Sequence, residues 1–211
     1  ANDPDCNGDG TIEETFTIED NLYDFDWIDV EAVDGDYIWL ASSDGHIYYS
    51  WNGGQDWAEE NLGWPVKAID MNSNASQGLA VGDNGYYAYF NGSSWTNDYF
   101  GALSNKDLGD VEFDVDNYAW ISIDAEEYYY FNGSAFSLRS TNLSGSTVMN
   151  AVTTTKDGDG NINVWFAGED GRIMFSKDNT NWYYQVTEVP TGINSIVAAN
   201  PTHVWSAGDK S

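Results

Sequence analysis

Residues 5–12 read Asp-Cys-Asn-Gly-Asp-Gly-Thr-Ile, and they have the residue types and spacing of a calcium-binding loop. Such a loop offers oxygen ligands at alternate positions and places a glycine where the chain turns sharply. Its last position would be Phe16 here, so the usual bidentate glutamate must be replaced by a nearby one. The alternative is a plain Asn-Gly hairpin turn. The predicted calcium ligands are Asp5, Asn7, Asp9, Thr11 and Glu13.

Carboxylates that could act as acid and base recur along the chain. Paired carboxylates hydrolyse glycosidic bonds, so a glycoside hydrolase is one hypothesis. Asp and Glu together number 35, however, so their presence alone discriminates nothing. His46 and His203 have no Ser or Cys partner at a catalytic spacing, which favours structural roles. We therefore predict a protein that is not an enzyme. The recurring carboxylates are Asp29, Glu31, Asp70, Asp110, Glu112 and Asp114.

Aromatic residues are abundant, with 10 Trp and 14 Tyr, and could stack on a ligand. Most of them occupy repeated positions, where packing between repeats explains them. Trp51, Trp64 and Tyr99 fall instead at turns or connections. These three are the predicted ligand-binding residues.

The acidic and aromatic residues belong to a sequence repeat of about 40 residues. The segment Trp-Leu-Ala-Ser-Ser-Asp-Gly at 39–45 recurs in related form four times, at steps of 40, 41, 45 and 40 residues. This period is typical of a four-stranded propeller blade. The five copies begin at Trp39, Leu79, Trp120, Trp165 and Trp205.

Each repeat is predicted to contain two hairpins. Asp44-Gly45, Asn84-Gly85 and Asp170-Gly171 supply the positive φ angles that a tight turn requires. Aromatic runs follow, as expected for strands that are covered on both faces. No stretch has a sustained period of 3.6 residues, so no long helix is expected. A second turn follows, and an aromatic residue comes four or five positions after its Asn or Asp, at Trp57, Trp95, Phe136 and Trp182.

The repeats resemble those of two propeller families. Ser50-Trp51-Asn52-Gly53-Gly54-Gln55-Asp56-Trp57 is similar to the Asp-box turn of bacterial neuraminidase repeats. The combination of an aromatic residue, Ala-Gly-x-Asp-Gly and an aromatic strand resembles propellers of the photosystem II assembly factor type. The resemblance covers residues 25–211 and implies an all-β propeller. Because Asp-box propellers include sialidases, the resemblance also makes sialidase activity a possible function. Sialidases bind the substrate carboxylate with three arginines, and this chain has only Arg139 and Arg172.

The fifth copy ends at its first turn, which raises the question of how the ring closes. Asn7-Gly8 and the alternating segment 11–18 have the spacing of the missing outer strands. We therefore predict five blades, with the fifth completed by the N-terminal segment. Two alternatives remain, a longer propeller and strand addition between molecules, which would build a filament or surface layer. The predicted units are 1–24, followed by repeats at about 25–63, 64–106, 107–145, 146–190 and 191–211.

The formal net charge is −28, with only 7 Lys and Arg residues. This charge excludes nucleic acid and anionic membranes as partners, and no apolar run is long enough to insert into a bilayer. A solvated acidic surface suits high salt, which indicates a secreted or cell-surface protein of a halophile. A non-catalytic binding or scaffold module with a protein or glycan partner is the leading hypothesis. Predicted glycosylation sites are Asn74, Asn91, Asn132 and Asn142.

Overall fold

The computed structural model describes residues 25–101, 106–123, 127–143, 147–187 and 191–209. This part of the chain is built from β-strands and short 3-10 turns, as the sequence predicts. None of its helices is long and apolar enough to cross a membrane. The predicted calcium residues and the predicted closing strand at 11–18 lie outside the described residues.

The strands form four sheets of four antiparallel strands and one sheet of two. Each sheet is a blade. Blade 1 contains β1 (Trp27–Ala32), β2 (Ile38–Ser42), β3 (His46–Ser50) and β4 (Ala58–Asn61). Blade 2 contains β5 (Val66–Met71), β6 (Gly78–Gly82), β7 (Tyr86–Phe90) and β8 (Trp95–Tyr99).

The other blades follow the same order along the chain. Blade 3 contains β9 (Leu108–Phe113), β10 (Ala119–Ile123), β11 (Glu127–Phe131) and β12 (Phe136–Ser140). Blade 4 contains β13 (Met149–Lys156), β14 (Ile162–Gly168), β15 (Arg172–Ser176) and β16 (Trp182–Val186). Blade 5 has two described strands, β17 (Ile193–Asn200) and β18 (His203–Gly208).

Turn chemistry explains why each second strand folds back. Asn84 has φ 56° and Gly85 has φ 73°, within the 3-10 turn Asp83–Gly85. Asp170 (φ 56°) and Gly171 (φ 64°) repeat this geometry in the turn Glu169–Gly171. Asn, Asp and Gly tolerate this left-handed region better than other residues do. The predicted positive φ angles are confirmed at both turns, but at the predicted Asp44-Gly45 turn only Gly45 (φ 97°) has one.

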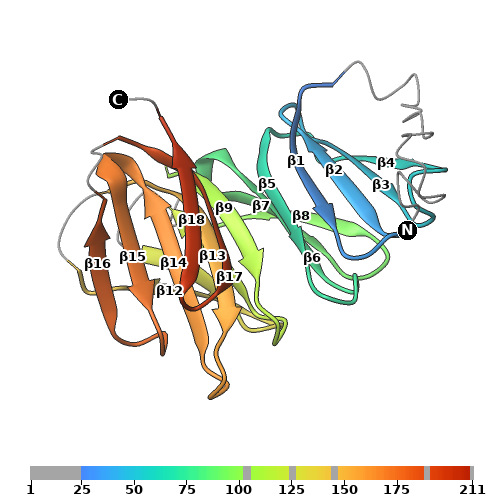
Figure 1. The fold of residues 1–211 in the computed structure, drawn as a ribbon. Coiled ribbons are helices and arrows are strands. Elements are labelled where there is room, and N and C mark those ends of the chain that lie inside the picture. The colour runs from blue at the N-terminus through green and yellow to red at the C-terminus, as the bar shows by residue number, and fades with distance from the viewer. Residues whose placement is uncertain (1–24, 102–105, 124–126, 144–146, 188–190, 210–211) are drawn as a thin grey trace, which may run out of the picture.

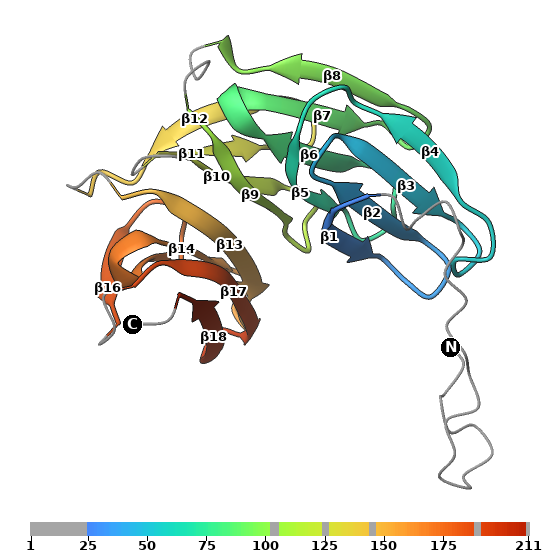
Figure 2. The same ribbon diagram turned by 90° about the horizontal axis from the view of Figure 1, so that it is seen from above.

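The blades stand side by side around an arc (Figures 1 and 2). The first strand of each blade is innermost, and these strands pack against one another in the order β1, β5, β9, β13 and β17. In Figure 2 blades 1 and 5 stand at the two ends of the arc. The architecture is therefore a β-propeller of four-stranded blades, and the fifth blade has two described strands.

Each pair of neighbouring blades encloses its own apolar cluster. Between blades 3 and 4, Trp120 and Tyr128 pack against Phe166, Met174 and Trp182. Burying one such side chain contributes roughly 1.5–3 kcal/mol. The hydrophobic core is thus divided among the interfaces between blades. The inner strands also carry polar and charged side chains.

Candidate functional site

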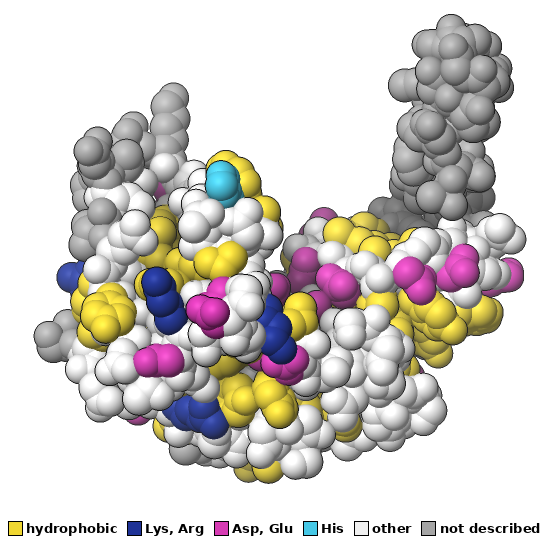
Figure 3. All heavy atoms as spheres, turned by 60° about the horizontal axis from the view of Figure 1, so that its bottom comes forward, with side chains coloured by type: hydrophobic (Ala, Val, Ile, Leu, Met, Phe, Trp, Pro, Cys, Tyr) yellow, Lys and Arg dark blue, Asp and Glu magenta, His cyan; other side chains and the backbone are white. Residues whose placement is uncertain are grey.

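Carboxylates gather on the inner strands, where the blades converge. Asp29 and Glu31 lie on β1, Asp70 on β5, and Asp110 and Glu112 on β9. Figure 3 shows acidic side chains in the notch between the two arms of the arc. The inner strands therefore place acids from three blades on one concave surface.

Several of these side chains accept a hydrogen bond from a backbone amide of the following blade, and we call each such contact a clip. Asp29 Oδ2 accepts a hydrogen bond from the Ile69 amide of blade 2 at 2.8 Å. Asp110 Oδ2 accepts one from the Val152 amide of blade 4 at 2.8 Å. In both aspartates Oδ1 accepts the amide of the following residue, at 2.9 and 2.8 Å. Both oxygens are thus occupied by backbone donors.

A second set of clips lies further along the same strands. In the strand register, each of these residues lies opposite the first residue of the repeated turn segment on the neighbouring strand, as Glu112 lies opposite Trp120. Each accepts a hydrogen bond from a backbone amide of the next blade. The acceptor is a carboxylate in blades 2 and 3 and a hydroxyl in blade 4. The pairs are Asp70 with Phe113, Glu112 with Thr154 at 3.4 Å, and Thr153 Oγ1 with Ala198 at 3.3 Å.

Burial makes these carboxylates weak acids. It raises the pKa of Asp110 to about 7 and that of Glu112 to about 8, and for Glu112 the neighbouring charge of Asp110 adds to the effect. Burial and then the charges of Glu112 and Glu31 raise the pKa of Asp70 well above its usual value. Burial also raises the pKa of Asp29. The cluster is therefore incompletely ionised at neutral pH, and a cation beside it would favour ionisation.

The acids border a hollow of about 250 Å³. Asp114, only 3% exposed, lies beside it and accepts a hydrogen bond from the Trp120 indole at 3.1 Å. Burial raises the pKa of Asp114 as well. The walls of the hollow are Glu31, Asp70, Met71, Ser73, Glu112, Phe113, Asp114 and Val115.

Metal ligation has no support within the described part of the chain, where no group of three or more His, Cys, Asp or Glu residues could hold a metal ion. In the acidic turn 157–161, Asp157 Oδ1 accepts the amides of Asp159 and Asn161 at 3.0 and 2.9 Å. That carboxylate shapes the turn. The predicted calcium loop falls outside the described residues.

The predicted aromatic residues form two groups. Trp51, 49% exposed, lies in the turn before β4, 6.0 Å from the Tyr49 ring. Trp64 follows β4 and is 8% exposed within the apolar cluster between blades 1 and 2, and the Tyr86 ring stacks on it at 5.8 Å. Tyr86 is also 6.0 Å from Tyr99, which is 56% exposed. The structure thus joins Trp64 and Tyr99 through Tyr86, and Trp51 lies at the other end of β4.

Three of the predicted glycosylation sites share one turn geometry. Asn74, Asn91 and Asn132 each accept hydrogen bonds at Oδ1 from the amide and hydroxyl of the serine two residues on. All three are exposed, and so is Asn142, which follows β12. These positions are accessible, and the turns hold the asparagines in place.

The two arginines and His46 are engaged in packing. The Arg139 guanidinium lies 3.8 Å from the centroid of the Tyr130 ring. Arg172 donates to Thr147 Oγ1 at 2.7 Å. His46 lies 3.1 Å from an Asp44 oxygen and its ring is 4.6 Å from Phe25.

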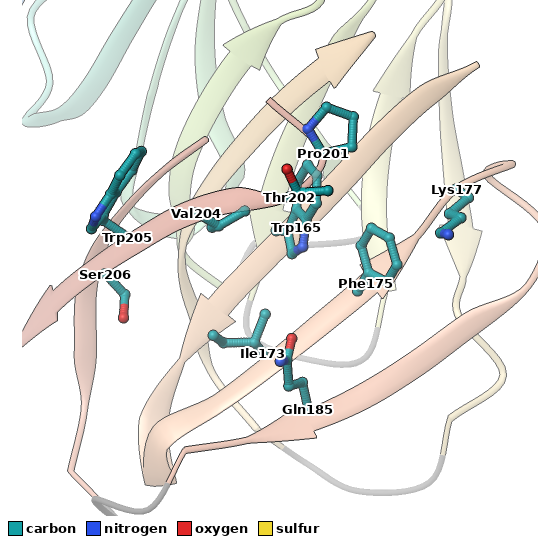
Figure 4. A pocket seen from close by; sticks show the side chains of 10 residues that line it. All are labelled: Trp165, Ile173, Phe175, Lys177, Gln185, Pro201, Thr202, Val204, Trp205 and Ser206. Carbon is teal, nitrogen blue, oxygen red and sulfur yellow. The ribbon is translucent and has the colours of Figure 1, made fainter. Parts of the chain in front are cut away.

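Sequence reasoning missed the grooves between blades, two of which have aromatic side chains on both walls. One, of about 390 Å³, lies between the face of blade 4 and β18 (Figure 4). Trp165 and Phe175 form part of its blade 4 wall, and Trp205 lies on the β18 side. The other lies between blades 2 and 3 beside Phe136. The signal for the second was in the repeat, where Phe136 stands at the position of Trp95 and Trp182.

No family model and no curated protein matches the sequence. Solved structures share its fold. YCF48 bound to D1 peptide superposes with a TM-score of 0.64 at 17% identity, over 86% of this chain and 60% of that one. The WD40 β-propeller domain of Doa1 gives 0.66 at 13%, over 88% and 62%. YCF48 from Cyanidioschyzon merolae gives 0.67 at 16%, over 90% and 66%.

These likenesses establish the class of protein, a β-propeller. The chain spans 60% to 66% of the length of the three structures. The fold is therefore common to all of them.

Proposed function

We propose that this chain is a non-catalytic binding propeller that recognises a protein partner outside the cell, through a basic segment of that partner. The carboxylate-lined hollow on the inner strands carries this proposal. Glu31, Asp70 and Glu112 converge there from three blades. A Lys or Arg side chain that enters the hollow would complement their charge and favour their ionised forms.

Two further observations support a binding role. The structural neighbours include YCF48 bound to D1 peptide and a WD40 domain. In addition, Asp29 and Asp110 use both carboxylate oxygens on backbone amides, which suits a scaffold better than proton transfer. An extracellular location fits the exposed sequon turns and the acidic composition. Calcium at residues 5–13 remains a prediction.

The test is fluorescence anisotropy with a short labelled peptide of alternating Arg and Gly, and a matched peptide with Gln in place of Arg. The basic peptide should bind and the neutral one should not. Affinity should fall in high salt, because salt screens the ion pairs. It should rise between pH 6 and pH 8.5, because the pKa of Glu112, which lines the hollow, is about 8.

Variants locate the binding surface. The double variant Glu31→Gln with Glu112→Gln should weaken binding about tenfold, as expected for the loss of two modest ion pairs. Glu60→Gln removes a charge from the outer strand β4 and is the matched control. Equal binding of the basic and neutral peptides would refute the proposal. Selective binding on a glycan array, with no peptide binding, would replace the protein partner by a glycan.

A second candidate, a subunit of an extracellular filament, is favoured by one observation. Within the described chain, β18 pairs only with β17, and the groove of about 390 Å³ lies beside it. An unpaired strand edge is a template for strand addition. Light scattering over a range of concentrations tests this candidate. A constant monomer mass would exclude it, and growth of the mass with concentration would support it.

A further inference from the structure

A small groove lies on the outer part of the contact between blades 2 and 3, distant in the fold from the inner carboxylates. Its volume is about 270 Å³. The Tyr87 and Phe136 rings are 4.8 Å apart, and the Tyr89 and Phe131 rings 5.6 Å. We call it the Asp98 groove, and its walls are Tyr87, Tyr89, Thr96, Asp98, Phe131, Ser134 and Phe136.

The contact between blades 3 and 4 shows what fills this place one blade later. Strand register makes Tyr128 and its partner Arg139 equivalent to Tyr87 and its partner Asp98. In blade 3 the Arg139 guanidinium lies over the ring of Tyr130, 3.8 Å from its centroid. The chain thus places its own cation on the tyrosine face at this interface.

Two substitutions change the corresponding space between blades 2 and 3, where the Phe100 ring stacks on Tyr87 at 4.4 Å and a groove remains open beside it. Asp98 is shorter than Arg139 and carries the opposite charge. Phe136 occupies the position of Trp182 and has a smaller ring system. Tyr89, the residue equivalent to Tyr130, therefore lines a groove in which no cation of the described chain lies.

The polar groups of the groove are held in place. The Tyr87 hydroxyl donates to Asp98 Oδ2 at 3.3 Å, and the Tyr99 amide donates to Oδ1 at 2.8 Å. Gln77 Nε2 donates to the Tyr89 hydroxyl at 2.8 Å and to the Gly133 carbonyl at 3.2 Å, which ties blade 2 to the turn of blade 3. Burial, with the charge of Asp98, raises the pKa of Tyr87 to about 12, so this hydroxyl keeps its proton.

We propose that the Asp98 groove binds an arginine side chain of a protein partner, with its guanidinium over the Tyr89 ring and beside the Asp98 carboxylate. The cation would take the place that Arg139 occupies one blade later. The volume suits a single side chain, because pockets for whole ligands are usually larger. The inference rests on the proposed function for the nature of the partner, but it concerns a different surface.

The direct test uses N-acetylarginine amide as the probe, with N-acetylcitrulline amide as the uncharged control. The protein is the full chain expressed in bacteria, so that Asn132 beside the groove carries no glycan. Aromatic resonances of Tyr87 and Tyr89 are followed by NMR during titration. We expect the arginine probe to shift both saturably and the citrulline probe to leave them unchanged. Equal shifts with both probes, or shifts at other tyrosines alone, would overturn the proposal.

Three variants and a control sharpen the test. Asp98→Arg copies the arrangement of blade 3 and should reduce binding at least about tenfold by filling the groove with its own guanidinium. Phe136→Trp restores the ring found at this position in blade 4, where Trp182 is present together with the Arg139 guanidinium, and should leave binding of the probe largely unchanged. Asp98→Asn should weaken binding about threefold to tenfold. Glu60→Gln, at the equivalent strand position opposite Ile47, should change nothing.

The outcomes separate this inference from the proposed function. If Asp98→Arg folds and binds the arginine probe as the unmodified protein does, the inference is wrong, even where the alternating Arg-Gly peptide still binds at the inner hollow. If Glu31→Gln with Glu112→Gln leaves the affinity for that peptide unchanged while Asp98→Arg removes binding, the proposed function fails at the inner hollow and the groove assignment stands. Thermal unfolding of each variant shows whether the fold is kept.

Discussion

Trp120 of blade 3 and Trp205 of blade 5 stand at the same position of the repeat but have different surroundings. Trp120 is 2% exposed and Trp205 is 56% exposed. Trp120 lies on β10, which has strands on both sides, and Tyr128 and Tyr130 cover its ring at 5.6 and 4.9 Å. In the described chain Trp205 has no such third strand beside it. The third strand and the following blade, and not the repeat motif itself, therefore bury the tryptophan.

The largest expected difference is between two alanine variants. Trp120→Ala should lower the free energy of unfolding by about 3–5 kcal/mol, because it empties a closed interface. Trp205→Ala should lower it by less than about 1 kcal/mol, because much of the ring already contacts solvent. Chemical denaturation measures both. Equal losses would mean that Trp205 is covered in solution, either by residues 1–24 or by another molecule.

A smaller difference in the free energy of unfolding is expected between two clips, the one from Asp110 of blade 3 to blade 4 and the one from Thr153 of blade 4 to blade 5. Asp110→Asn should cost about 1–3 kcal/mol, because asparagine has one acceptor oxygen for the two amides that Asp110 serves. Thr153→Val removes a single hydroxyl bond of 3.3 Å to Ala198 and should cost about 1 kcal/mol. Hydrogen exchange at the Val152 and Ala198 amides gives the local readout. Faster exchange at Ala198 in the Asp110 variant would show that the clips are coupled.

The smallest effect is a pH dependence at the contact of blades 3 and 4. Burial raises the pKa of Glu112 from 4.5 to about 8, so the folded state holds a proton that the unfolded state has released. This contribution to stability is complete below about pH 4.5 and is lost as the pH rises through 8. Glu112→Gln should therefore stabilise the protein at pH 9, where the buried glutamate is ionised, and have little effect at pH 4, where it is neutral. Denaturation curves at both pH values check this, and the same gain at both would contradict it.

The sequence predicts the propeller because its signals are local. Each repeat carries its own turn residues, such as Asn84-Gly85 and Asp170-Gly171, and its own aromatic strand. The spacing of about 40 residues between these segments then indicates the blades. The inner carboxylates were visible as residue types, but among 35 acids nothing distinguished them. Their role depends on backbone amides 40 or more residues away, such as Ile69 opposite Asp29. The Asp98 groove required the strand register that makes Asp98 equivalent to Arg139.

The clips between blades have an evolutionary consequence. The side chain of each clip belongs to one repeat, as Asp29 does, while the recipient supplies only a backbone amide such as that of Ile69. Every residue except proline has this amide. A duplicated or transplanted repeat therefore brings its attachment with it and demands almost nothing of its new neighbour's sequence. Repeats joined in this way can be duplicated or reordered during evolution with few changes in the neighbouring repeat. The main restriction is that the residue that donates the amide must not be proline.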